Sequence, residues 1–132
     1  MQISNSNSKS LDSIYAQAGE AAFYKLVEEF YKGVEADPLL RPIYPEDLAP
    51  GKEKLALYLI YRTGGPTTYT DRQGHPRMRA RHMPFKIGQA ERDAWMKNML
   101  AALDATPELA AHKEVLTEFF DGLATFMINQ PG

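Results

Sequence analysis

The sequence predicts an all-α domain of four main helices joined by short, irregular connections. Apolar residues recur at intervals of three and four along most of the chain, as the buried face of a helix requires. No useful length of sequence alternates apolar and polar residues as a half-buried strand would. With 132 residues the chain suits one domain with one core. We expect residues 1–10 to be a flexible polar tail and residues 11–132 to form the domain.

The first part of the domain contains two expected helices and a proline-rich corner. Residues 12–19 suit a short helix, and residues 20–37 place apolar side chains on one face and charged side chains on the other. Asp37-Pro38 ends this second helix, because the residue before a proline disfavours helical geometry. Residues 38–48 hold three prolines, so they offer only a short helical turn and a loop.

A third helix and a long connection occupy the middle of the chain. The helix is expected over residues 51–63, and residues 67–73 are polar and expected to be irregular. Residues 75–87 can hold little more than a turn or two of helix, because Pro84 interrupts them. Long connections in compact domains are usually functional or wrapped around something.

Two amphipathic helices complete the domain. Residues 88–105 place Trp95 and Met99 on or near one apolar face. Residues 107–127 begin with a proline, which suits the first turn of a helix, and carry apolar side chains at helical spacing to Met127.

The composition excludes several classes of function. A net charge of −2 argues against a surface made for nucleic acid, because dedicated binders usually carry a large positive excess. The absence of cysteine excludes disulfides, iron–sulfur clusters, Cys-ligated zinc and covalent haem attachment, and it fits a reducing cytosol. No apolar run is long enough to span a bilayer, and the polar start has no signal-peptide core.

The basic stretch from Arg77 to Ile87 contains a single histidine, His82. A lone histidine is most often solvated or satisfied within the fold. Here Met-Pro-Phe follows it, arginines crowd it without acidic partners, and it lies in the long connection. Haem meets all three conditions, because iron takes an axial imidazole, the porphyrin needs apolar contacts and the propionates need cations. Nucleic acid would explain the arginines but not the apolar run.

Three aromatic side chains with polar tips form a second candidate group. Tyr31 lies on the apolar face of the second helix, Tyr44 lies in the proline-rich corner, and Trp95 lies on the inner face of the 88–105 helix. Either they are core residues whose polar tips are satisfied locally, or they are donors aimed at a ligand in an apolar pocket. Spacing alone does not choose between these interpretations.

Five segments, taken in order, resemble a known family: EEFYKGVEADPLL, IYPEDL, GGPTTY, GHPRMRARHMPFKI and ERDAWM. The chain resembles a truncated haemoglobin of group II over about residues 11–129. The resemblance implies a shortened globin fold, a two-on-two helical sandwich around a non-covalently bound haem b. The family usually has Gly-Gly between its first two helices. Here Ala18-Gly19 stands there, and a single glycine can supply the positive φ.

The resemblance also implies roles for individual residues. His82 would be the proximal ligand of the iron and thus the metal ligand. Tyr31, Tyr44 and Trp95 would line the distal side and act on the bound ligand. Gly51 would leave that side without a hydrogen-bonding or gating side chain.

The other expected haem contacts divide by chemistry. Polar and cationic candidates would bind the propionates: Lys54, Tyr69, Arg79 and Arg81. Apolar candidates would pack on the porphyrin or line the distal side: Leu48, Leu55, Leu59, Met78, Phe85, Ile87 and Met99.

The resembled family implies a globin that reversibly binds O2 and other small ligands. Three donors in a dry pocket, each contributing about 1–3 kcal/mol, predict slow O2 release and high affinity. That suits nitric oxide dioxygenation, peroxide reduction or sensing better than oxygen transport, and whether the protein is an enzyme stays open. Two other hypotheses stay open as well: a haem-free helical module that binds a partner or regulates, and a nucleic acid binder with a basic loop.

The expected partners follow from the same resemblance. They are O2, CO and NO, anions on ferric haem, and an unidentified reductase, with no nucleic acid and no membrane. Dimers are common in the resembled family, so a homodimer is expected, and the expected location is the cytoplasm.

Overall fold

The computed structural model describes residues 3–74 and 86–129, and this part of the chain is helical without strands. The all-α class predicted from the sequence is therefore confirmed. The elements in chain order are α1 (Ile3–Ala18), α2 (Glu20–Ala36), the 3-10 turn η1 (Arg41–Ile43), α3 (Ala49–Arg62), α4 (Thr68–Gln73), α6 (Gln89–Asp104), the 3-10 turn η2 (Pro107–His112) and α7 (Lys113–Phe126). Within these residues no helix is long and apolar enough to cross a membrane.

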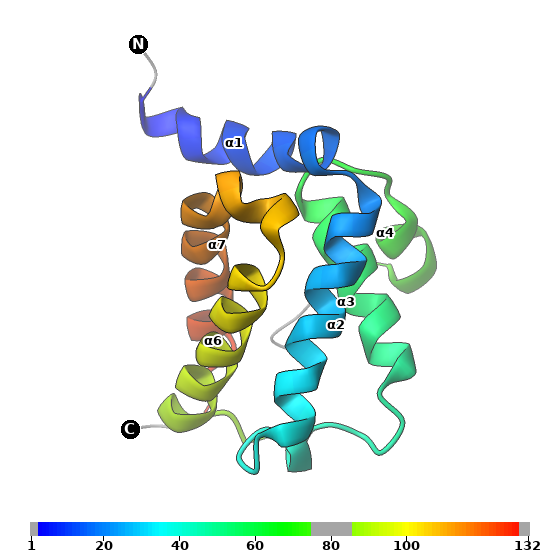
Figure 1. Ribbon diagram of the computed structural model, residues 1–132, viewed down its shortest axis with the longest axis vertical. Helices are drawn as coiled ribbons and strands as arrows, with labels where there is room; N and C mark the ends of the chain where they lie inside the picture. Colours follow the sequence, from blue (N-terminus) through cyan, green and yellow to red (C-terminus); the bar gives the residue numbers. More distant parts are fainter. Residues whose placement is uncertain (1–2, 75–85, 130–132) are drawn as a thin grey trace.

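Two pairs of helices form the body of the domain (Figure 1). Helix α2 packs on α3 to make one pair, and α6 packs on α7 to make the other. The pairs are joined because α2 also packs on α6, while α1 lies across one end and contacts α2, α3 and α7. This is the two-on-two arrangement expected from the sequence.

Helix α2 has the most extensive buried face among these helices. Its buried residues recur at intervals of three and four: Ala22, Phe23, Leu26, Val27, Phe30, Tyr31 and Val34. Full burial of a large apolar side chain contributes about 1.5–3 kcal/mol, so this face fixes the rotation of α2 about its own axis. Tyr31 belongs to the same row, and its side chain must therefore face the interior.

Helix α1 begins earlier than the sequence analysis expected. It starts at Ile3, so most of the segment expected as a flexible tail has a helical backbone. No proline or glycine lies between Ile3 and Ala18, so nothing in this stretch interrupts helical hydrogen bonds. The division of the chain at residue 10 stays a prediction.

The segment expected to be irregular over residues 67–73 contains the short helix α4. Thr70 Oγ1 donates to the carbonyl of Thr67 at 3.0 Å, and Thr67 Oγ1 lies 3.2 Å from an oxygen of Asp71. Tyr69 is buried and packs edge-on against Tyr58 at 5.3 Å between ring centroids. Tertiary packing of one aromatic ring thus stabilises a turn that polar composition did not predict.

The last expected helix is divided into η2 and α7, with Pro107 in the first turn of η2. Leu109 in η2 is fully buried, and the apolar face of α7 continues through Leu116 and Phe120. The buried face is the one predicted, although the chain changes helical type near His112.

The end of α3 is held against α1 by one backbone contact. The amide of Tyr15 donates to the carbonyl of Thr63 at 3.0 Å, which brings Gly64 against the backbone of Asp12. Gly64 has a φ of 97°, and Gly19, between α1 and α2, has a φ of 86°. The positive φ expected at Gly19 is therefore confirmed.

Replacing Gly64 with alanine is expected to lower the free energy of unfolding by about 3 kcal/mol. The left-handed backbone contributes about 1–2 kcal/mol, and a Cβ pressed against the Asp12 carbonyl contributes the rest. Gly19→Ala is the matched control, because a Cβ there meets nothing within 4 Å. Urea unfolding measures both, and equal losses for the two variants would contradict the α1–α3 contact.

Candidate functional site

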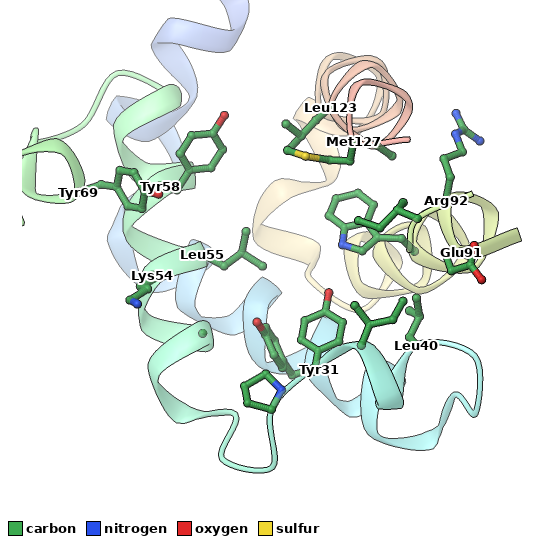
Figure 2. Close-up of a pocket in the computed structure, with 17 residues that line it drawn as sticks. Tyr31, Leu40, Lys54, Leu55, Tyr58, Tyr69, Glu91, Arg92, Leu123 and Met127 are labelled. Carbon is green, nitrogen blue, oxygen red and sulfur yellow. The ribbon is translucent and has the colours of Figure 1, made fainter. Parts of the chain in front are cut away.

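A cavity of about 380 Å³ lies between the two helix pairs. Its size and mainly apolar walls with a few polar groups are typical of pockets for small molecules and cofactors. Figure 2 shows Tyr31 and Leu55 pointing into it, with Leu123 and Met127 on the α7 side. The lining residues come from α2, the corner after it, α3, α4, α6 and α7: Tyr31, Leu40, Ile43, Tyr44, Pro45, Gly51, Lys54, Leu55, Tyr58, Tyr69, Ile87, Glu91, Arg92, Trp95, Leu123, Ala124 and Met127.

The three aromatic residues singled out in the sequence all line this cavity. Tyr31 comes from α2, Tyr44 from the corner between α2 and α3, and Trp95 from α6. The rings of Tyr31 and Tyr44 meet edge-on, with centroids 5.6 Å apart and planes at 80°. The structure therefore brings together three side chains that lie far apart in the sequence.

The hydroxyl of Tyr31 lies over Gly51 of α3. A Cβ at Gly51 would be 2.8 Å from Tyr31 Oη, so the absence of a side chain there makes room for the hydroxyl. The tyrosine is only 4% exposed. Burial raises its pKa to about 12, because the phenolate would lose its hydration. Tyr31 is thus a neutral phenol and a hydrogen-bond donor at physiological pH.

Burial also raises the pKa of Tyr44 above its ordinary value. The neighbouring Tyr31 acts in the same direction, while a side-chain hydrogen bond with Trp95 acts against it. An indole has only its N–H to offer, so Trp95 is the donor and the hydroxyl of Tyr44 the acceptor. The proton of Tyr44 is left for another acceptor.

Trp95 is held by aromatic rings on both sides. Its ring lies 5.3 Å from that of Phe30 on α2 and 5.8 Å from that of Phe120 on α7. Such contacts contribute about 0.5–1.5 kcal/mol each beyond area burial, and they limit the rotamers of the indole. The position of Trp95 therefore depends on both helix pairs.

The other expected cofactor contacts fall into three groups. Those that line the cavity are Lys54, Leu55, Tyr69 and Ile87. Those that are buried elsewhere in the core are Leu48, Leu59 and Met99. Those that lie outside the described residues are His82, Met78, Arg79, Arg81 and Phe85.

Several residues that line the cavity were not predicted from the sequence. The unpredicted lining residues are Leu40, Ile43, Pro45, Tyr58, Glu91, Arg92, Leu123, Ala124 and Met127. The α7 members could have been found, because they continue the apolar face of that helix. Leu40 and Pro45 gave no such signal, since they lie in a corner without periodicity.

Glu91 and Arg92 line the cavity, but their charged ends point away from it (Figure 2). Glu91 Oε1 accepts from the amide of Gly88 at 2.8 Å and so caps α6. Arg92 pairs with Asp121 and lies 3.3 Å from Thr125 Oγ1, which ties α6 to α7. These charges serve the helices around the cavity rather than its interior.

The donor set fits a haem better than a metal ion held by side chains. The cavity is mainly apolar, three donors meet on its walls, and the cationic Lys54 is among its lining residues. Within residues 3–74 and 86–129, no three His, Cys, Asp or Glu side chains are grouped to hold a metal ion. The walls therefore suit an apolar group that carries its own metal and anionic substituents.

Comparison with known proteins agrees with this geometry. The family model of bacterial-like globins matches residues 13–129. The chain belongs to the bacterial-like globin family. The globin is 38% identical over 122 residues to the group 2 truncated hemoglobin YjbI of Bacillus subtilis (strain 168), a match that covers 92% of each chain. The resemblance to group II truncated haemoglobins is thus confirmed, and membership implies haem and oxygen binding.

Two solved structures also resemble the globin closely over nearly their whole length. The hemoglobin of the thermophilic phototrophic bacterium Chloroflexus aurantiacus is 49% identical, with a TM-score of 0.86 over 89% of this chain and 98% of that chain. The truncated oxygen-avid haemoglobin from Bacillus subtilis is 38% identical, with a TM-score of 0.84 over 89% of this chain and 99% of that chain. The fold therefore extends over nearly the whole of both proteins.

The raised pKa of Tyr31 predicts how stability changes in alkali. The unfolded chain ionises this tyrosine near pH 10.0 and the native globin near pH 12, so the unfolded state loses its proton first. Stability should therefore fall across this window, by up to about 2 kcal/mol from this group.

Urea unfolding at about pH 9 and about pH 11.5 measures that fall. In Tyr31→Phe the fall should be smaller than in the unchanged globin. Phe126→Leu, at an exposed ring that contributes no titrating group, must keep the original fall. An identical fall in Tyr31→Phe would contradict the burial of an un-ionised phenol.

Proposed function

We propose that this globin holds haem b in the cavity between the helix pairs and binds O2 tightly, with slow release. The observation that carries the proposal is the meeting of three polar tips in one mainly apolar cavity. Tyr31 is a buried neutral phenol, its ring meets that of Tyr44 edge-on at 5.6 Å, and Trp95 lines the same cavity. A solved relative described as oxygen-avid, at 38% identity, supports the same function.

The residues act on a small ligand mainly through hydrogen bonds. A bound haem supplies an iron atom with a free coordination position for O2, CO or NO, and for anions when ferric. Tyr31 donates its hydroxyl proton toward that space, and Gly51 leaves the path of the hydroxyl clear. Trp95 donates to the hydroxyl of Tyr44, which leaves the Tyr44 proton available to the ligand. The dry walls strengthen each of these bonds.

His82 is proposed as the residue that would hold the iron. Its segment lies outside the described residues, but the chain on either side of it reaches the cavity at Tyr69 and Ile87. Lys54 and Tyr69, with Arg79 and Arg81, are proposed partners of the propionates, while Met78 and Phe85 are proposed porphyrin contacts.

Tight binding suits a redox or sensing role better than oxygen transport. Donors that slow release of O2 keep it available for reaction with nitric oxide. The same donors would hydrogen-bond a peroxide during its reduction, which consumes electrons and no O2. Such turnover requires an electron source, so a reductase is a proposed partner, and a homodimer in the cytoplasm is the proposed state.

The first test is the optical spectrum of the purified protein and of His82→Ala. We expect a Soret band that shifts on reduction and that is lost or strongly altered in the variant. His112→Ala is the control, because His112 ends η2 and does not line the cavity. A colourless protein that refuses added haemin would overturn the proposal in favour of a haem-free binding module.

The second test is the rate at which O2 leaves the haem-loaded protein. Tyr31→Phe and Tyr44→Phe should each raise it about fivefold to a hundredfold, because each removes a hydrogen bond of about 1–3 kcal/mol to the ligand, and Trp95→Phe should raise it less, because it removes the partner of the Tyr44 hydroxyl. Tyr61→Phe on α3 is the control, since Tyr61 does not line the cavity. Rates unchanged in all three variants would show that the donors do not meet the ligand.

A further inference from the structure

We propose that Arg41 is a positioning residue that holds Tyr44 at the cavity by fixing the corner between α2 and α3. The proposal rests on the proposed function, because it assigns Arg41 a part in how the Tyr44 donor is aimed. Arg41 itself does not line the cavity. It acts through the backbone of the residues that do.

The guanidinium of Arg41 bonds three successive carbonyl groups. Nη1 donates to the carbonyl oxygens of Tyr44 at 3.2 Å and Pro45 at 3.0 Å, and Nη2 donates to that of Glu46 at 3.1 Å. Hydrogen bonds from a charged donor are stronger than neutral ones. One side chain thus fixes the path of the chain on which Tyr44 is carried.

The corner has few other hydrogen bonds after Tyr44. Between α2 and α3 it contains only the three-residue turn η1, and Pro42 and Pro45 have no amide hydrogen to donate. Tyr44 closes that turn through its amide, which donates to the carbonyl of Arg41 at 3.2 Å. Between Tyr44 and α3 one other side-chain bond holds the chain, from the amide of Ala49 to Asp47 Oδ1 at 3.1 Å, so loss of the guanidinium should loosen this stretch.

The start of the corner is tied to the helix that carries Trp95. Asn98 Nδ2 donates to Asp37 Oδ2 at 2.9 Å, and the amide of Arg41 donates to the carbonyl of Asp37 at 2.9 Å. Asn98 lies three residues after Trp95, one turn along α6. A series of hydrogen bonds therefore runs from Asn98 on α6 through Asp37 and Arg41 to Tyr44. The hydroxyl of Tyr44 in turn lies beside Trp95 on the same helix α6.

A lysine at position 41 could not make all three of these hydrogen bonds at once. Its ammonium is a single point with rotating donors, whereas the guanidinium is a rigid fork that spreads its donors over several acceptors. Arg41→Lys should keep the positive charge and lose some of the three hydrogen bonds to the corner carbonyls. Arg41→Gln should lose the positive charge and most of these hydrogen bonds.

The decisive experiment is a double-mutant cycle on O2 release from the haem-loaded globin. Arg41→Gln should raise the off-rate about fivefold to tenfold, as expected when one hydrogen bond to the ligand is misaligned, and Arg41→Lys should fall between it and the wild type. In the Tyr44→Phe background, Arg41→Gln should change the rate less than about twofold. Equal fold-changes in both backgrounds would show that Arg41 does not act through Tyr44.

The C–O stretching frequency of the carbon monoxide complex reports hydrogen bonding to the ligand. A general loss of folding stability would not change this frequency. It should shift in Arg41→Gln in the same direction as in Tyr44→Phe, because both withdraw a donor from the ligand. Arg72→Gln is the control, since Arg72 pairs with the exposed Glu53 at 3.5 Å and does not line the cavity. An unshifted frequency in Arg41→Gln would overturn the proposal.

Hydrogen–deuterium exchange of the haem-free protein separates this proposal from the proposed function. Peptides covering residues 38–48 should exchange faster in Arg41→Gln and in Arg41→Lys than in the wild type, while α6 keeps its protection. Unchanged exchange in the corner would overturn the role of Arg41. Failure of the wild type to bind haem would instead overturn the proposed function, and the exchange result would still report whether Arg41 fixes the corner.

Discussion

One run of aromatic contacts underlies the rest of this structure. The rings of Tyr44, Tyr31, Phe30, Trp95 and Phe120 touch in that order, with centroids between 5.3 and 5.8 Å apart. The run crosses from the corner through α2 and α6 to α7, so it joins the two helix pairs. It also includes the three side chains with polar tips at the cavity. The contacts that hold the pairs together are therefore the contacts that aim the donors.

A cavity of about 380 Å³ within a chain of 132 residues needs support from its surroundings. The support lies around the cavity rather than in it. Arg92 ties α6 to α7 through Asp121, and Asn98 ties α6 to the corner through Asp37. Polar groups that face outward from the walls can fix the helices in place without entering the apolar space between them. A bound group would add its own contacts to the walls and so stabilise the folded state.

Sequence reasoning could predict what depends on periodicity and composition. The apolar row on α2 showed that Tyr31 faces inward, and the inner face of the 88–105 helix showed the same for Trp95. Both predictions concern a residue on a regular helix. The sequence could not say that Leu59 and Met99 are buried away from the cavity, because periodicity reports burial and not which space a buried side chain borders.

The features that escaped prediction depend on tertiary contacts. Helix α4 forms where Tyr69 packs on Tyr58, a contact between segments that a polar sequence does not indicate. Arg41 gave no signal, because its acceptors are backbone carbonyls and no side-chain pattern reports them. The room that Gly51 leaves for the Tyr31 hydroxyl was likewise visible only once α2 and α3 were placed together.

The most direct test of this account is a crystal structure of the haemin-loaded protein with cyanide bound. The account predicts a flat group between the α2–α3 and α6–α7 pairs, with His82 on one side of the iron. On the other side, Tyr31 Oη and the Tyr44 hydroxyl should lie within hydrogen-bonding distance of the cyanide, with Trp95 bonded to Tyr44. A group bound elsewhere, or tyrosines turned away from the cyanide, would contradict it.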